Sequence, residues 1–246
     1  MGIKKVGILA SVKEEIDIFK ELIKGDVWDG IEVCFNHGGV GKVSAALVTQ
    51  EMIYEEDPDI LIYVGAAGSI SADVNMNDIV IVTRAIDAEL DVRGYSPTLK
   101  KGEDPFTHIR IYKPDQILSM IALDSPLGFR IIEGFAATTS VFMDKDQKEA
   151  FVEQNLADLS IEEEEGHVLL PNIVDMESCA FFNVCIRHGK PCLVIKTVAN
   201  SADSDASEEY ESFRKNSIKN YLSVVAYVLN TLKKQNLVAE SHSESI

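Results

Sequence analysis

Four short and almost uninterrupted apolar runs constrain the fold of this chain more than any other feature of its sequence. They are KVGILAS at 5–11, DILIYVG at 59–65, DIVIVTRAI at 78–86 and CLVIKTVA at 192–199. Runs of this kind, rich in β-branched residues, are typical of strands buried on both faces. Further strands are expected at 32–37 and 129–138. The sequence therefore predicts a central sheet that is covered on both sides.

The segments between these strands carry helical periodicity. We expect helices at 13–23, 42–55, 114–123 and 208–233. In the second helix the predicted buried face holds Val43, Ala46, Leu47 and Ile53. In the last helix the predicted buried stripe is Ile218, Tyr221, Leu222, Val225, Leu229 and Leu232. This alternation predicts an α/β fold, a single three-layer domain whose central mixed β-sheet is flanked by helices.

The length of the chain fits one domain with one core. It has 246 residues, of which 46% are hydrophobic, which suits a single sizeable core better than two. We assign residues 1–234 to this domain and expect the polar segment 235–246 to be a disordered tail.

Charge and cysteine use narrow the class of protein. The net charge of −17 disfavours binding to nucleic acid or to anionic membranes. No stretch approaches the roughly 18 apolar residues of a membrane span, and the start does not resemble a signal peptide. The four cysteines are scattered without a C-x-x-C pair, which favours a reduced, cytoplasmic protein without structural zinc.

The predicted strands end in polar and glycine-rich segments, where ligands of such sheets bind. These segments are Ser11 with KEE at 13–15, GAAGS at 65–69, TTSVFM at 138–143, VDMES at 174–178 and VANSAD at 198–203. Together they supply a glycine-rich wall, an aromatic ring, carboxylates and an amide, without a basic cluster. A neutral, hydroxyl-rich ligand with a ring fits this set. Carboxylates at the end of a buried strand are costly unless something binds them.

Three other motifs are weaker. HGGVGKV at 37–43 resembles a phosphate loop, but Asn36 stands at its first glycine and Val43 at its Ser/Thr. GAAGS does not have the G-x-G-x-x-G pattern of a dinucleotide site. The acidic run at 162–165, within an acidic insertion at 156–170, is more typical of a solvated loop than of a metal site.

The ordered set of motifs resembles one family. VGILASVKEEI, GGVGKVSAAL, VGAAGSI and VDMES are similar to the 5′-methylthioadenosine/S-adenosylhomocysteine nucleosidases, within the purine nucleosidase and phosphorylase superfamily. The resemblance runs from Val6 to about Phe213 and is weak at 144–172. It implies a nucleoside phosphorylase-like fold and hydrolysis of an N-glycosidic bond, with no metal or organic cofactor.

The resemblance also assigns roles on the sugar side of the site. Glu177 would bind the ribose hydroxyls and Met176 would pack on the sugar, with Asp175 in support. A carboxylate on the hydroxyls stabilises the positive charge that builds on the ribose in the transition state. Glu15 would be the general base that polarises the attacking water.

On the base side, the resemblance implies that Phe142 stacks on the purine and that the backbone of Met143 reads its edge. The sugar and base would be lined by Ala66, Ala67 and Gly68.

One position departs from the family. Its catalytic Asp, in a pattern like R-A-I-S-D, corresponds to Asn200 here, and its Arg to Lys196. Asn200 could accept from a protonated N7 and donate to O6 of a 6-oxopurine, as in inosine, guanosine or futalosine. Alternatively, the chain is an adenine-releasing nucleosidase in which Asp203 or a water supplies the proton. The third possibility, a non-catalytic binding or storage protein, is disfavoured by the retention of Glu15 and Glu177.

The attacking group is expected to be water. Phosphorylases of this superfamily bind phosphate with arginines, where this chain has KEE at 13–15 and Asn77, and Arg84 lies within a strand. Carboxylates there would repel phosphate.

The resemblance implies a homodimer whose segment 86–95 closes the partner's pocket. Arg93 in that segment is either a solvated loop residue or binds a carboxylate on the 5′ substituent.

Overall fold

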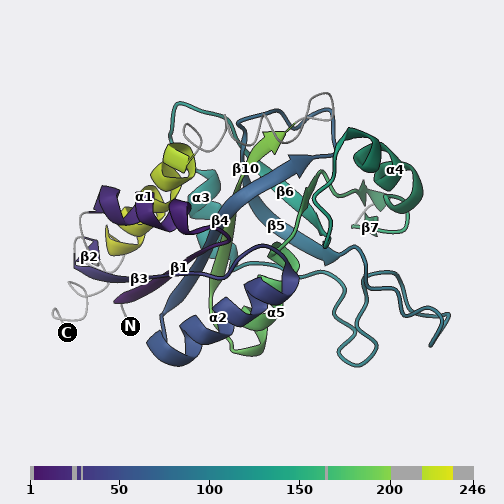
Figure 1. Cartoon of the computed structure of the whole chain (residues 1–246), viewed down its shortest axis with the longest axis horizontal. Helices are drawn as coiled ribbons and strands as arrows, with labels where there is room; N and C mark the ends of the chain where they lie inside the picture. The colour runs from purple at the N-terminus through teal and green to yellow at the C-terminus, as the bar shows by residue number, and fades with distance from the viewer. Residues whose placement is uncertain (1–2, 24–26, 29, 164–165, 201–217, 235–246) are drawn as a thin grey trace.

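An eight-stranded mixed sheet forms the centre of the molecule (Figure 1). The computed structural model describes residues 3–23, 27–28, 30–163, 166–200 and 218–234. In the sheet the strands follow the order β10-β5-β6-β9-β4-β1-β3-β2. Their bounds are β1 (Lys5–Ala10), β2 (Val27–Trp28), β3 (Ile31–His37), β4 (Ile60–Ser69), β5 (Ile79–Asp87), β6 (Ile131–Thr138), β9 (Ile173–Asp175) and β10 (Cys192–Asn200).

The sheet closes on itself through β10. This strand pairs in parallel with β4 and antiparallel with β5, so the pairings β4–β9–β6–β5–β10 form a ring. From β4 the sheet continues through β1 and β3 to β2. The predicted strand at 59–65 is longer than expected, because β4 runs on through the GAAGS segment to Ser69. The ring brings the carboxyl ends of several strands together.

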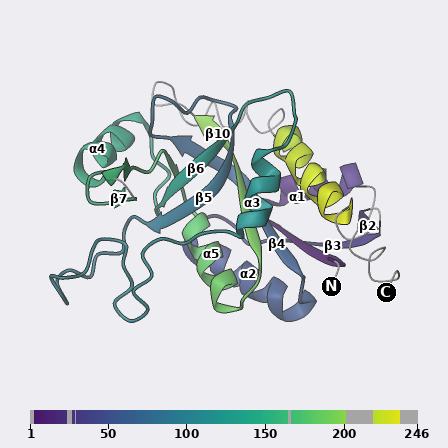
Figure 2. The ribbon, with the colours of Figure 1, turned by 180° about the vertical axis from the view of Figure 1, so that it is seen from behind.

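Helices cover both faces of the sheet (Figures 1 and 2). On one face lie α1 (Lys13–Ile23), α3 (Gln116–Leu123) and a helix over 218–234. On the other lie α2 (Lys42–Glu56) and α5 (Ser178–Arg187). The predicted three-layer α/β fold with a mixed sheet is therefore confirmed.

The buried face predicted for the second helix is wrong except for Ile53. In α2 the buried side chains are those of Ala45, Val48, Thr49, Met52 and Ile53. Val43 is 75% exposed and Leu47 is 59% exposed. Apolar residues occur on both sides of α2, so their spacing could not identify the side that faces the sheet.

The last helix agrees with the prediction where it is described. Its predicted stripe, from Ile218 to Leu232, is buried against α1 and the sheet. The predicted start near Glu208 and the predicted tail at 235–246 lie outside the described residues.

The segment at 144–172 holds elements that the sequence did not predict. These are α4 (Lys145–Asn155), with Asp144 as its N-cap, and a small hairpin of β7 (Ile161–Glu162) and β8 (Val168–Leu169). Of the expected solvated loop at 162–165, Glu162 ends β7 and Glu163 follows it, and both side chains are exposed. Glu163 pairs with Arg84 at 2.5 Å.

The described ranges contain no helix with both the length and the apolar character that a membrane crossing needs.

Candidate active site

A cavity of about 500 Å³ opens where the carboxyl ends of β1, β4, β6, β9 and β10 meet. It lies where the sequence predicts a ligand site. The predicted residues that line it are Glu15, Ala66, Ala67, Gly68, Phe142, Met143, Asp175, Met176 and Glu177. The structure therefore brings these residues together around one space.

Asp175 is locked in place at the end of β9. Its side chain is fully buried and accepts hydrogen bonds from Thr138 Oγ1 at 2.8 Å and from the Ser178 backbone N–H at 3.0 Å. The Ser178 hydroxyl also donates to it. Since Ser178 begins α5, Asp175 joins the strand to the first turn of that helix.

A buried lysine from the last strand of the sheet neutralises the carboxylates. Lys196 Nζ lies 3.0 Å from Asp175 Oδ2 and 2.9 Å from Glu177 Oε2. It also lies 5.3 Å from the centre of the Tyr63 ring, a cation–π contact. Burial alone would lower the pKa of Lys196, but the charges of Glu177 and Asp175 raise it above its ordinary value. Lys196 is therefore a charged ammonium.

Glu177 follows β9 and faces the cavity with both oxygens held. Oε2 accepts from Lys196, and Oε1 accepts from the backbone N–H of Gly41 at 3.2 Å. The side chain is buried except for its edge on the cavity. These two donors fix the direction of the carboxylate.

Glu15 stands in the first turn of α1, next to the end of β1. Its Oε1 accepts from the Tyr221 hydroxyl at 3.1 Å, and its buried Oε2 has no hydrogen-bond partner among the described residues. Burial raises the pKa of Glu15 from 4.5 to about 7. A carboxyl with this pKa can take up or release a proton near neutral pH.

The opposite wall is apolar and partly open. Phe142 is 56% exposed and Val141 is also exposed, whereas Met143 is buried. These residues follow β6, and Ala66 to Gly68 of β4 line the same cavity.

One predicted residue, Arg93, is not among the described residues that line the cavity. Arg93 pairs with Asp91 at 2.6 Å and with Asp158 at 3.0 Å. The backbone of Asn200 pairs with Gly68, after an irregularity in β10 that follows Val198. The Asn200 side chain and the whole of Asp203 lie outside the described part of the chain.

Some residues of the site were not predicted to act there. Lys196 was noted only as a replacement for Arg, and Tyr221 only as part of a buried stripe. Gly41 was noted only within a glycine-rich motif, without a contact of its own. A signal existed for Lys196 alone, since a lysine inside an apolar strand needs a buried anion. The contacts of Tyr221 and Gly41 join distant parts of the chain, so no local sequence pattern predicts them.

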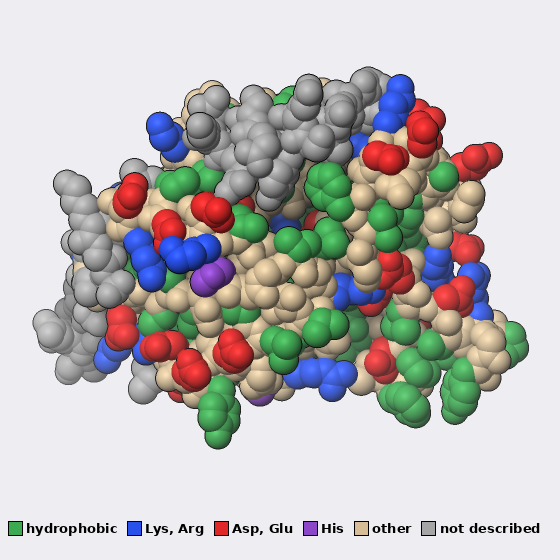
Figure 3. Space-filling model, in the orientation of Figure 1, with side chains coloured by type: hydrophobic (Ala, Val, Ile, Leu, Met, Phe, Trp, Pro, Cys, Tyr) green, Lys and Arg blue, Asp and Glu red, His purple; other side chains and the backbone are tan. Residues whose placement is uncertain are grey.

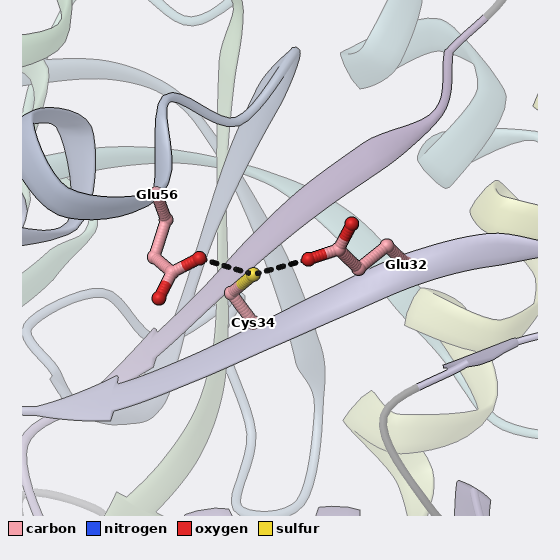
Figure 4. Close-up of side chains that lie close together, drawn as sticks. All are labelled: Glu32, Cys34 and Glu56. Atoms are coloured by element: carbon pink, nitrogen blue, oxygen red, sulfur yellow. Dashed lines mark hydrogen bonds between the residues drawn. The ribbon is translucent and has the colours of Figure 1, made fainter.

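Away from the cavity, one group of three possible metal ligands occurs among the described residues: Glu32, Cys34 and Glu56 (Figure 4). Lys5 Nζ already pairs with both carboxylates, at 3.1 Å and 2.6 Å. Burial and the hydrogen bond to Glu56 raise the pKa of the Cys34 thiol to about 12. A neutral thiol beside an ammonium is a poor ligand set for a cation. All four cysteines are free of disulfides.

The chemistry of the cavity follows from its charges. The pKa of one carboxyl, that of Glu15, is raised to about 7, a second carboxyl accepts from an ammonium and an amide, and apolar side chains line the same cavity. Of the described residues that line the cavity, none is Lys or Arg. This arrangement suits a flat ring attached to a hydroxyl-bearing group rather than a phosphate ester.

Known proteins share the sequence pattern along nearly the whole chain. The model of the family described as the phosphorylase superfamily matches residues 5–232. The 5′-methylthioadenosine/S-adenosylhomocysteine nucleosidase of Geobacillus kaustophilus is 25% identical over 248 aligned residues, which cover 94% of this chain and 99% of that protein.

Solved structures share the fold. A futalosine hydrolase mutant of Helicobacter pylori superposes with a TM-score of 0.79 at 22% identity, covering 93% of this chain and 100% of that one. The 5′-methylthioadenosine/S-adenosylhomocysteine nucleosidase of Neisseria meningitidis, in complex with methylthio-immucillin-A, gives the same TM-score, identity and coverage. The family resemblance predicted from the motifs is confirmed, and the chain belongs to the phosphorylase superfamily.

Proposed function

We propose that this chain is a purine nucleosidase, which hydrolyses the N-glycosidic bond of a purine nucleoside and releases the free base. The observation that carries the proposal is the presence of Glu15 and Glu177 on one cavity in different electrostatic states. One can exchange a proton and the other is a fixed negative charge. Glycoside cleavage needs this division of work. The relatives named as nucleosidases support the reaction class.

In the proposed mechanism Glu177 binds the ribose hydroxyls. As the bond to the base breaks, positive charge builds on the sugar ring, and a fixed carboxylate next to it stabilises the transition state more than the ground state. Lys196 and the Gly41 N–H hold that carboxylate in position. Met176 packs on the sugar, and Asp175 supports the group by fixing Lys196.

Glu15 is the proposed general base. Its unpartnered Oε2 is an acceptor for a proton of the attacking water. The raised pKa matches the task, because a base works best when its pKa lies near the working pH.

Phe142 and Met143 form the proposed base-binding wall, facing Ala66 to Gly68. For the departing base we propose a 6-oxopurine, as in inosine, guanosine or futalosine, because the residue at 200 is an amide. An amide can accept from a protonated N7 and donate to O6, whereas a carboxylate would repel O6.

A second candidate is an adenine-releasing nucleosidase of the methylthioadenosine or S-adenosylhomocysteine type, in which Asp203 or a water acts as the acid. The name of the Geobacillus relative favours it. The 5′ substituent would then be a thioether, and Arg93 could bind a carboxylate on it only by leaving Asp91 and Asp158.

Water is the proposed nucleophile. Phosphate would need a cation, and the ammonium of Lys196 is already shared between two carboxylates. Lys13 pairs with Asp17, and Arg84 pairs with Glu163.

The proposal includes a homodimer in the cytoplasm. Val43 and Leu47 on α2 are exposed, as are Val40 and Phe142 of the cavity lining, and hydrophobic side chains are visible over α2 in Figure 3. A second copy would cover this apolar surface. Sedimentation should then give a dimer, and Leu47→Glu should shift it toward the monomer.

The test of function is release of free base from a panel of purified nucleosides: inosine, guanosine, futalosine, adenosine, methylthioadenosine and S-adenosylhomocysteine. Turnover of any of them excludes a storage protein. The order of rates separates the 6-oxo from the 6-amino candidate.

A further inference from the structure

The glycine-rich turn at 38–42 meets the cavity through Val40, which lines it, and through Gly41, which binds Glu177. Gly41 has φ 100° and ψ 164°, a backbone region that is essentially restricted to glycine. This conformation points its N–H at Glu177. The next residue, Lys42, begins α2 and reaches in another direction.

Lys42 bridges two carboxylates beyond the end of β5. Its Nζ lies 2.9 Å from Asp87 Oδ1 and 2.8 Å from Glu89 Oε2. Partial burial opposes the charge of Lys42, but the hydrogen bonds to Asp87 and Glu89 raise its pKa. The Asp87 carboxylate also accepts from the backbone N–H groups of Glu89 and Leu90. The Lys42 side chain is thus mostly buried, and the turn at 87–90 holds the Asp87 carboxylate that it binds.

Glu89 also binds the loop that follows β6. Its Oε1 accepts from the Ser140 backbone N–H at 2.9 Å, and its Oε2 accepts from the Ser140 hydroxyl at 2.6 Å. Ser140 is followed directly by Val141 and Phe142, the exposed apolar residues at the cavity mouth. One carboxylate therefore ties three segments together: the start of α2, the end of β5 and the cavity loop.

We infer that Lys42 and Glu89 are positioning residues that hold the loop at 140–143 in the conformation in which Phe142 meets the purine. The inference rests on the proposed function, since it concerns the contact between Phe142 and the purine base. It adds two residues that touch no substrate and act through Ser140.

The alternative is an ordinary surface ion pair. Such pairs contribute little, because solvent screens them and long side chains lose entropy. The Lys42–Glu89 contact differs in that the same carboxylate also takes both donors of Ser140. Hydrogen bonds to a charged group are stronger than those between neutral groups.

Kinetics of Lys42→Met, Glu89→Gln and Ser140→Ala test the inference. A stacking contact is made equally in the ground and transition states, so its loss should raise KM about tenfold and change kcat less than about threefold. Lys42→Arg, which keeps the charge, should restore most of the affinity. The double variant Lys42→Met with Ser140→Ala should lose less than the sum of the single variants, because both act through Glu89.

Lys190→Met is the matched control. Lys190 is a similarly half-buried lysine, paired with Asp57 at 2.5 Å, but Asp57 caps the end of α2 opposite to Lys42. It should leave KM unchanged. Equal effects of Lys190→Met and Lys42→Met, or a loss confined to kcat in Glu89→Gln, would overturn the inference.

Amide hydrogen exchange supplies a readout that does not depend on turnover. In Glu89→Gln, exchange of the peptide spanning 139–144 should speed up about tenfold relative to wild type, while other peptides keep their rates. If the wild-type protein cleaved no nucleoside, the proposed function would fail. The exchange measurement would still show whether Glu89 holds the loop at 140–143. Unchanged exchange in both Glu89→Gln and Lys42→Met would overturn it in either case.

Discussion

Lys196 Nζ lies 2.9 Å from Glu177 Oε2, and the lysine side chain is 0% exposed. A buried ammonium is stable only when anions surround it. Here Asp175 supplies the second anion, at 3.0 Å. The group as a whole carries negative charge, and of its two carboxylates, which both line the cavity, only that of Glu177 keeps an exposed edge. The sheet therefore keeps a carboxylate ready at the cavity wall before any ligand arrives.

Removing the ammonium should destabilise the fold. Lys196→Met leaves Asp175 and Glu177 buried without their cation, which should lower the free energy of unfolding by about 3–5 kcal/mol. Lys190→Met, which removes a lysine from a partly exposed pair, should lower it by less than about 1 kcal/mol. Denaturant unfolding followed by circular dichroism measures both. Equal stability of the two variants would mean that Lys196 is not the counter-ion of this group.

The two glutamates should be needed for turnover but not for folding. Glu15→Gln and Glu177→Gln should each lower kcat roughly 10²-fold or more, the scale for losing a general base or one electrostatic contact in the transition state. Initial rates of base release measure this, with circular dichroism as the folding control. A wild-type rate in Glu15→Gln would remove its assignment as the base.

The pKa of Glu15 predicts opposite trends of activity and stability with pH. As a base it must be ionised, so kcat/KM should rise as pH passes upward through about 7. Folding favours the protonated form, because the folded pKa of about 7 exceeds the ordinary 4.5. This stabilising contribution is complete below the ordinary pKa and is lost as pH rises through the folded one.

Glu15→Gln, which imitates the protonated carboxyl, isolates the effect on stability. It should be more stable than wild type at about pH 8, by up to about 3 kcal/mol, and the difference should shrink toward about pH 5. Unfolding titrations at the two pH values measure it. A difference that grows on acidification would have the wrong sign for a raised pKa.

Much of this site was predictable because its residues lie at strand ends. Buried parallel strands leave a strong apolar signal, and the polar segments that follow them converge by topology. The carboxylates of VDMES were conspicuous for the same reason, since buried charge is rare without a purpose. Glu15 by itself had the pattern of an ordinary first-turn helix acid, and only the resemblance of the whole motif set gave it a role.

Other features could not be predicted from local patterns. The buried face of α2 was wrongly assigned because Val43 and Leu47 are apolar yet exposed, and spacing alone cannot identify what a helix contacts. Tyr221 is far from Glu15 in sequence, and their hydrogen bond exists only because the last helix packs against α1. The short strands β7 and β8 are below the length at which alternation is informative.

The residue at 200 should determine which purine is preferred. If Asn200 reads O6 and N7 together, wild type should favour inosine, guanosine or futalosine over the 6-amino nucleosides. A donor facing the 6-amino group would cost about 1–3 kcal/mol, or roughly ten- to a hundredfold in kcat/KM. Asn200→Asp should then shift the preference toward adenosine and methylthioadenosine. A wild type that prefers methylthioadenosine would instead assign the proton to Asp203 or a water.

The central claim is that water cleaves the N-glycosidic bond, and the most direct test traces the oxygen of that water into the sugar product. Wild-type protein is incubated with each nucleoside in phosphate-free buffer made with water enriched in oxygen-18, and both products are analysed by mass spectrometry. Hydrolysis predicts free purine base, a released sugar that carries the label, and a rate that added phosphate does not change. Strict dependence on phosphate with formation of a sugar phosphate, or no base from any nucleoside tested, would contradict the account.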